Sequence, residues 1–363
     1  MEAFEAKHLR AWVIAVCFLL ASVGGLAISV PKPAGVNQPD VKEVATVLRE
    51  SREVAAPANP AAQEGKRGVP TRPSPATAPA DKDPAPQTSL EAYEGLGAWV
   101  DLFDFTDGPD QAFIIVEELA SRGVKTLYVQ TGRWNLGGDV AEGASMNVFI
   151  ERAHSHGMKV VGWYLPGFND IDTDIRRSLA VLNHVTPAGQ KFDGFAPDIE
   201  DKRAVGNDLG RFNAGIGEYS RRLRAAVPPG TVLGAIVVDA KNNKRAPTYW
   251  AGFPWDQIGQ NYDVVLPMAY WSVVKKKADC FTTTDVVSYQ REVVAEMTAQ
   301  MGTSKPLHMI GGIADCSSAA EIAAFADVSI ELGAIGGSIY DFWTTHTNPS
   351  RDALWGHLNR FNR

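Results

Sequence analysis

From residue 93 to residue 363, short apolar segments alternate with amphipathic segments at a regular spacing. Eight of the apolar segments have the length and composition of β-strands. They are Leu96–Phe105, Val124–Gln130, Met158–Leu165, Phe192–Glu200, Thr231–Asp239, Tyr262–Trp271, Pro306–Ala314 and Ala334–Trp343. Strands that alternate with helices form a parallel sheet, and eight such units in about 270 residues match the size of a (β/α)8 barrel, or TIM barrel. The sequence therefore predicts this α/β fold.

Helix-like segments separate most of these strands. They are Gln111–Ser121, Asn147–His156, Ile171–His184, Leu209–Ala226, Thr284–Met301, Ser317–Leu332 and, after the last strand, Ser350–Arg360. A doubly wound open sheet is the alternative arrangement of such units. Because the acidic segment Asp101–Asp104 follows the first strand in place of a glycine-rich phosphate motif, the barrel is favoured.

The N-terminal part of the chain has a different character. Residues 1–31 contain an uncharged run of 20 residues, Ala11–Val30, which follows Lys7 and Arg10. This length predicts an uncleaved transmembrane anchor with a cytoplasmic N-terminus, and a cleaved signal peptide is the alternative. Residues 32–92 are rich in proline and alanine and predict a disordered linker. We therefore expect a domain over 93–363 outside the cytoplasm, held at the cell membrane or secreted.

The charge of the chain limits its partners. The net charge is −7, and residues 1–92 carry as many basic as acidic side chains, so the excess of acid lies in residues 93–363. No basic stripe occurs in that region, which argues against nucleic acid as a partner. The sequence makes no prediction of the oligomeric state.

The fourth predicted strand ends in an acidic segment. Side chains alternate between the two faces of a strand, so Asp198 and Glu200 project to the same side, about 7 Å apart along the chain. Two carboxyl groups on one rigid face raise each other's pKa and are suited to acid and base chemistry. The simpler interpretation is an acidic turn that caps the following helix.

Acidic and aromatic residues also follow the other predicted strands. In a TIM barrel the active site lies at the carboxyl ends of the strands. The residues predicted there are Asp101, Asp104, Gln130, Arg133, Trp134, Trp163, Tyr164, Asp239, Met268, Tyr270, Trp271, Asp315, Tyr340, Asp341 and Trp343, with Asp198 and Glu200. Aromatic rings stack on sugar rings and carboxyl groups serve glycosidic bond cleavage, so this set predicts a carbohydrate substrate.

Two motifs give this sequence a family resemblance. The first is the segment that reads Asp193-Gly194-Phe195-Ala196-Pro197-Asp198-Ile199-Glu200. It resembles the strand-four signature Asp-Gly-x-Asp-x-Asp-x-Glu of the chitinase-like family 18 glycoside hydrolases. On the sixth strand, Met268-Ala269-Tyr270 resembles the Met-x-Tyr of the same family. The resemblance implies a glycoside hydrolase on a (β/α)8 barrel.

The resemblance also implies a role for three residues. Glu200 would be the general acid that protonates the leaving oxygen. Asp198 would orient the substrate's acetamido group as that group attacks the sugar carbon, and Tyr270 would hydrogen-bond the same group. Such a substrate-assisted route needs no protein nucleophile.

The sequence departs from the family pattern at two positions in the motif. Ala196 replaces a carboxylate beneath Asp198, and without that like charge we expect Asp198 to stay ionised. Pro197 lacks a backbone donor and predicts a bulge or a strand end, which would shift Asp198 and Glu200 relative to each other. Trp343 is offset by two residues from the family's eighth-strand tryptophan, so we assign it only a place at the rim.

A conventional mechanism with two carboxyl groups stays open. In that case Asp198 or Glu200 would act with a carboxylate across the rim, and the candidates are Asp104, Asp239, Asp315 and Asp341. An inactive barrel that binds glycan or takes part in an envelope complex is the other interpretation, and Ala196 is the feature that supports it.

Cys280 and Cys316 follow neighbouring strands, so we expect a disulfide between them in an oxidising compartment. His154 and His156 lie at a predicted helix end, with no carboxylate at ligand spacing. We therefore predict no metal site and no cofactor.

Overall fold

The computed structural model of the protein describes residues 88–363 except 242–247, 249 and 275–284. Its eight strands form one parallel sheet in the order β6-β5-β4-β3-β2-β1-β8-β7. Two parallel bridges join the edges of this sheet, from Val265 to Leu307 and from Met268 to Ile310. The sheet therefore closes on itself, and the predicted (β/α)8 barrel is confirmed.

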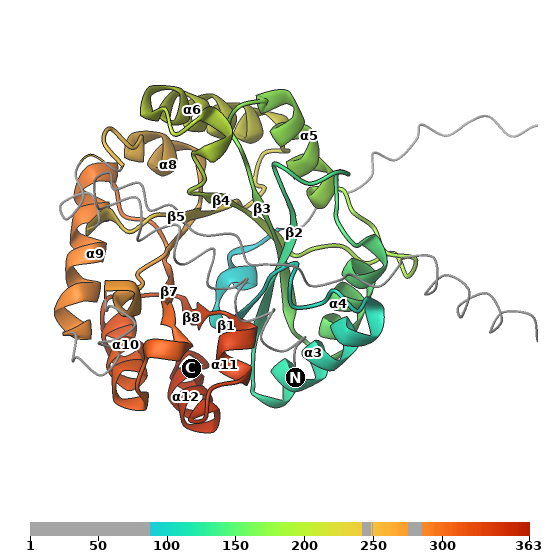
Figure 1. Cartoon of the computed structure of the whole chain (residues 1–363), viewed down its shortest axis with the longest axis vertical. Helices are drawn as coiled ribbons and strands as arrows, with labels where there is room; N and C mark the ends of the chain where they lie inside the picture. Colours follow the sequence, from blue (N-terminus) through green and yellow to red (C-terminus); the bar gives the residue numbers. More distant parts are fainter. Residues whose placement is uncertain (1–87, 242–247, 249, 275–284) are drawn as a thin grey trace, which may run out of the picture. The chain divides into compact units, whose positions relative to one another are not determined.

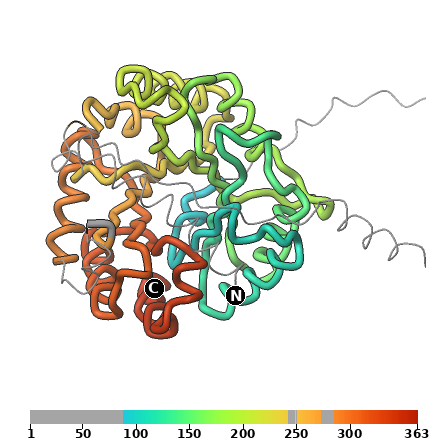
Figure 2. The backbone as a smooth tube through the Cα atoms, in the orientation of Figure 1, coloured from blue at the N-terminus to red at the C-terminus, as the bar shows by residue number. Residues whose placement is uncertain are grey.

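All eight predicted strands are present, with shifted ends. They are β1 (Gly95–Val100), β2 (Thr126–Arg133), β3 (Lys159–Leu165), β4 (Gly194–Ile199), β5 (Gly234–Val237), β6 (Val264–Pro267), β7 (His308–Ile313) and β8 (Gly336–Tyr340). The last strand pairs with the first, and the trace in Figure 2 shows the C-terminal segment in red beside the first strand in cyan. This pairing brings residues from both ends of the domain to the same part of the barrel mouth.

The α-helices lie on the outside of the strands (Figure 1). They are α3 (Pro109–Ser121), α4 (Gly143–Ser155), α5 (Ile171–Leu182), α6 (Leu209–Ala226), α8 (Trp255–Asn261), α9 (Val286–Met301), α10 (Ala319–Glu331), α11 (Phe342–His346) and α12 (Arg351–Leu358). Short 3-10 helices add η2 (Leu90–Tyr93), η3 (Arg203–Val205), η4 (Trp271–Val274), η6 (Ala314–Cys316) and η7 (Asn359–Phe361). The sequence predicted neither α8 nor α11.

Several strands end earlier than predicted, and aspartate side chains explain the endings of β1 and β8. After β1, the Asp101 carboxylate accepts a hydrogen bond from the Phe103 N–H at 2.7 Å, and Asp104 accepts one from the Asp101 N–H at 3.0 Å. These bonds favour a turn over an extended chain. After β8, Asp341 accepts from the Thr344 N–H at 2.9 Å and so caps α11. The predicted strands to Phe105 and Trp343 are therefore wrong at their ends.

Aromatic side chains fill the interior of the barrel, and one of them, Tyr93, makes two hydrogen bonds to the backbone. Tyr93 donates a hydrogen bond to the Phe195 carbonyl at 2.9 Å and accepts one from the Gly234 N–H at 3.0 Å. Trp99 stacks on Tyr128 with ring centroids 4.3 Å apart. The interior is a packed core, as expected for a barrel of this size, and it forms a rigid floor beneath the mouth.

The expected membrane segment, residues 1–31, lies outside the described residues, as does the predicted linker up to residue 87. Among the helices of the described residues, none is long and apolar enough to span a bilayer. The anchor, the linker and the location outside the cytoplasm stay predictions.

Replacing Tyr93 by phenylalanine tests the floor of the barrel. We expect the free energy of unfolding to fall by about 1–3 kcal/mol in urea denaturation, because two buried backbone groups lose their partner. Tyr128→Phe is the matched control, since the buried Tyr128 hydroxyl has no hydrogen-bond partner among the described residues. That variant should keep the stability of the unmodified protein. Equal losses in the two variants would contradict the role given to the Tyr93 hydroxyl.

Candidate active site

Strand β4 carries Asp198 and Glu200 to the mouth of the barrel. Pro197 pairs with Tyr164 of β3, and Asp198 pairs with Ile236 of β5. The register of β4 has no shift, so the bulge expected at Pro197 is absent and the strand continues to Ile199. Glu200 follows the strand in a turn, so its position on the same face as Asp198 stays a prediction.

Asp198 is buried and holds its proton strongly. Its side chain has a relative exposure of 8%, and its Oδ1 atom has no hydrogen-bond partner among the described residues. Burial raises the pKa of Asp198 well above its usual value, and the charges of Glu200 and Asp201 raise it further. The expectation of an ionised Asp198 is therefore wrong. The absence of a carboxylate at Ala196 favours the ionised form, but the burial of Asp198 has a larger and opposite effect on its pKa.

Glu200 is the first residue after β4 and is only partly exposed. Burial, followed by the charge of Asp201, raises the pKa of Glu200 to about 8, against the opposing effect of Arg203. Burial works in the same direction on Asp201, but hydrogen bonds from Arg203 and Trp134 hold the pKa of Asp201 below its usual value. The pair therefore combines a protonated Glu200 with an ionised Asp201 near neutral pH.

Tyr270 lies three residues after the end of β6, and the charges of these acids act on its hydroxyl group. Burial raises its pKa well above the usual value, and the charges of Glu200, Asp198 and Asp341 add to the effect. Its ring centroid is 6.2 Å from that of Tyr340, the last residue of β8. The Tyr270 hydroxyl thus stays protonated and is a hydrogen-bond donor within the mouth.

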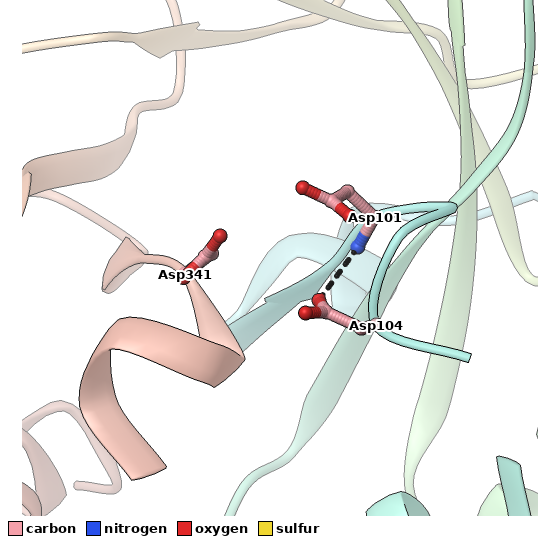
Figure 3. Close-up of side chains that lie close together, drawn as sticks. All are labelled: Asp101, Asp104 and Asp341. Atoms are coloured by element: carbon pink, nitrogen blue, oxygen red, sulfur yellow. Dashed lines mark hydrogen bonds between the residues drawn. The ribbon is translucent and has the colours of Figure 1, made fainter. Parts of the chain in front are cut away.

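A second acidic group lies where β1 and β8 meet. Figure 3 shows Asp101 and Asp104 on the turn after β1, with Asp341 at the start of α11. One ligand-type oxygen of each residue lies within 4.8 Å of the others. The Tyr340 hydroxyl donates to Asp101 at 3.2 Å. Burial raises the pKa of Asp101, and burial and the charge of Asp101 raise that of Asp341 to about 7.

Oxygen ligands of this kind suit a hard cation such as Mg²⁺ or Ca²⁺. However, the backbone N–H groups of Phe103, Asp101 and Thr344 and the Tyr340 hydroxyl already bind oxygens of this cluster. We therefore assign no metal to it. The two histidines considered from the sequence lie elsewhere: His154 contacts Asp193 at 2.7 Å, and His156 contacts Glu117 at 2.9 Å.

Three predicted aromatic residues lie inside or beside the mouth. Trp163 is buried in the barrel and makes an edge contact with Trp99, with ring centroids 6.1 Å apart. Trp134 is half-buried and donates a hydrogen bond from Nε1 to Asp201 at 2.9 Å. Trp343 lies in α11, half-buried and stacked on His346.

The structure places three other predicted site residues in packing positions. Tyr164 is fully buried and donates a hydrogen bond to Asp174 of α5 at 2.6 Å. Trp271 is fully buried, with its ring 5.1 Å from that of Phe325 in α10. Asp239 has a relative exposure of 1% and accepts hydrogen bonds from the Lys241 N–H and the Tyr289 hydroxyl. None of the three presents a surface to substrate in this conformation.

Alternation along the strands explains two of these positions. Trp163 faces the interior beside Trp99, so its neighbour Tyr164 faces the helices. The prediction assigned both neighbours to the rim, which strand geometry does not allow. Asp101 directly follows β1 and Arg133 ends β2, so both lie at strand ends as predicted. The predicted disulfide stays a prediction, because Cys280 lies outside the described residues.

Comparison with solved structures reveals the same barrel in glycan-cleaving proteins. A chitinase from Bacteroides thetaiotaomicron aligns with a TM-score of 0.52 and 13% identity, over 74% of this chain and 96% of that chain. The spore cortex-lytic enzyme SleL of Bacillus cereus has a TM-score of 0.53 and 11% identity, over 73% and 74%. A family GH18 chitinase from Cycas revoluta, in complex with allosamidin, has a TM-score of 0.52 and 12% identity, over 74% and 99%.

No protein-family profile and no curated protein sequence matches this chain. At these low identities the similarity to solved structures shows the fold. The chain is thus a (β/α)8 barrel of the kind seen in GH18 chitinases and related glycoside hydrolases, with an acidic mouth at the carboxyl ends of its strands.

Replacing Asp198 by asparagine tests the burial of this carboxyl group. Because the folded state raises the pKa of Asp198, its stabilising protonated form is present at low pH and is lost as pH rises. We expect the melting temperature of Asp198→Asn to exceed that of the unmodified protein at pH 7 by at least about 3 °C, or ~1 kcal/mol. The difference should close near pH 3.

Asp107→Asn is the control for this measurement, since Asp107 is exposed on a surface turn. Its melting temperature should follow that of the unmodified protein at both pH values. A destabilised Asp198→Asn at pH 7 would contradict the view that this carboxyl group is buried at a cost in stability.

Proposed function

We propose that the barrel is a glycoside hydrolase that cleaves O-glycosidic bonds in a glycan of the cell envelope. The observation that carries this proposal is a protonated Glu200 beside Asp198 and Tyr270 at the mouth of the barrel. A carboxyl group that keeps its proton near neutral pH is the group needed to protonate a leaving oxygen. The fold shared with solved chitinases supports the same reaction class.

In the proposed reaction, Glu200 donates its proton to the glycosidic oxygen as the bond from that oxygen to the sugar carbon breaks. The substrate's own acetamido oxygen forms the new bond to that carbon. Glu200, now ionised, then takes a proton from the water that attacks the same carbon and releases the acetamido oxygen. The proton returns to Glu200, so the enzyme is regenerated.

Asp198 and Tyr270 have atoms available for the acetamido group. The buried Oδ1 of Asp198 lacks a hydrogen-bond partner among the described residues, so it is a ready acceptor for the acetamido N–H. The protonated Tyr270 hydroxyl is a donor for the acetamido oxygen. Both contacts would hold the acetamido group against the sugar carbon.

The structure disfavours two of the residues that the sequence offered as the second carboxyl group of a conventional mechanism. Asp239 is fully buried and bonded to its own surroundings, and Asp315 is exposed on η6. Asp341 is the acid across the mouth whose charge reaches Tyr270. It is therefore the partner that we would pair with Glu200 in a conventional reaction.

The alternative is a barrel that binds glycan without cleaving it. Ala196 supports this alternative, because it is fully buried where the family motif has a carboxylate. The proposed location is the outer face of the cell membrane, through the segment 1–31, or outside the cell after signal cleavage. A disulfide between Cys280 and Cys316 belongs to the same proposal. The uncharged run of 20 residues is the observation that supports export.

The Glu200→Gln variant separates the hydrolase from the binding module. We expect its kcat on N-acetylated oligosaccharides to fall by roughly 100-fold or more, because the amide cannot donate a proton to the leaving oxygen. Calorimetry with the same oligosaccharides should show unchanged affinity. Turnover that survives in this variant would remove Glu200 from its role, and binding without turnover by the unmodified protein would favour the inactive barrel.

A further inference from the structure

Arg133 is the last residue of β2, at the end of the strand where the barrel mouth lies. The charges of Arg203, Asp201, Asp101 and Tyr340 all act on the pKa of its guanidinium group. The side chain is half-buried. The next residue, Trp134, donates a hydrogen bond from Nε1 to Asp201 at 2.9 Å, so this end of β2 lies beside the segment that follows β4, where Glu200 lies.

The Arg133 guanidinium makes no hydrogen bond or ion pair with any described residue, and its buried Nε lacks a partner there. Two other arginines use their remaining donors. Buried Arg177, whose Nε also lacks a partner, donates to three backbone carbonyl groups, and half-buried Arg224 donates to two carbonyl groups and to Asp263. A guanidinium group has five N–H donors, and its partial desolvation is costly when none of them is used.

The acids nearest to Arg133 are already bonded to other groups. Asp201 accepts hydrogen bonds from the Arg203 backbone, the Arg203 side chain and Trp134. Asp101 accepts from Phe103 and from Tyr340. The donors of Arg133 therefore remain available for an acceptor that enters the mouth from outside.

The local charge is favourable for an anion. Burial raises the pKa of Glu200 to about 8 and that of Asp341 to about 7, so these acids carry little negative charge in mildly acidic solution. Asp201 is neutralised by its ion pair with Arg203, at 2.6 Å. The charges of Asp201 and Asp101 act on Arg133, but both carboxyl groups are already bonded to other donors, so the Arg133 donors stay open to an incoming anion.

We propose that Arg133 binds a carboxylate carried by the substrate, and that the barrel therefore selects acidic glycans. Guanidinium is planar and presents paired N–H groups that match a carboxylate in a bidentate contact. Either a lactyl ether or a uronic acid brings such a group to a sugar chain. The inference rests on the proposed function for the reaction, but the binding preference is measurable without turnover.

The test uses calorimetry on the Glu200→Gln protein with tetrasaccharides of two kinds. One alternates N-acetylglucosamine with N-acetylmuramic acid, and the other alternates N-acetylglucosamine with glucuronic acid. Each is compared with its own carboxyl-reduced form, so that length and linkage are matched. We expect at least one acidic form to bind roughly 10- to 100-fold more tightly than its reduced form. The kind that shows the preference identifies the source of the carboxylate.

Adding Arg133→Gln should remove this preference, while Arg133→Lys should retain part of it, since lysine keeps the charge but loses the paired donors. Arg221→Gln is the matched control, because Arg221 is exposed on α6 and pairs with Glu218. It should leave the preference intact. Equal affinity for the acidic and reduced forms would overturn the proposal, and this comparison needs no Arg133 variant. A preference that survives Arg133→Gln would also overturn it.

The two proposals fail in different ways. If the unmodified protein cleaves neutral and acidic glycans equally well and shows no binding preference, the hydrolase stands and the role of Arg133 is refuted. If it cleaves none of them but binds the acidic forms through Arg133, the reaction fails and the binding site stands. Absence of binding to all four tetrasaccharides would refute the role of Arg133.

Discussion

Burial of carboxyl groups at the barrel mouth, with few cations to pair them, is the constraint on which the site depends. Asp198 has almost no exposed surface, and its Oδ1 has no hydrogen-bond partner among the described residues. Such a group keeps its proton, and its neighbours do so more readily for the same reason. The packed floor formed by Tyr93 and Trp99 holds the strand ends in place. The site therefore spends stability to hold acids in a chemically useful state.

The mouth divides into two acidic regions with different partners. In the first, Asp198 lies near the end of β4 and Glu200 directly after the strand, and an ion pair keeps Asp201 charged beside them. In the second, Asp101 and Asp341 meet because β1 pairs with β8. Charges from both regions act on the Tyr270 hydroxyl, and charges of Asp101 and Asp201 act on Arg133. A sugar chain crossing the mouth would meet proton donors, acceptors and the cation of Arg133.

Most of the fold could be predicted from sequence, because apolar segments of strand length alternate with helical segments throughout the domain. The position of Asp198 near the end of the fourth strand could also be predicted, whereas Glu200 lies in the turn after it. Local patterns could not predict α11, which depends on a cap formed by Asp341, or the burial of Tyr164 and Trp271 against helices. The protonation of Asp198 depends on how deeply the surrounding residues bury it. The free donors of Arg133 depend on bonds made by residues distant in sequence. Such properties require the assembled barrel.

The protonation state of Glu200 is the central claim, and a direct titration tests it. Carbon-13 NMR of protein labelled at the glutamate side-chain carboxyl carbon would follow each group with pH, and the signal missing from Glu200→Gln would assign Glu200. Our account predicts a midpoint at about pH 8 for this signal. A midpoint between about pH 4 and pH 5, as for an unperturbed glutamate, would contradict it.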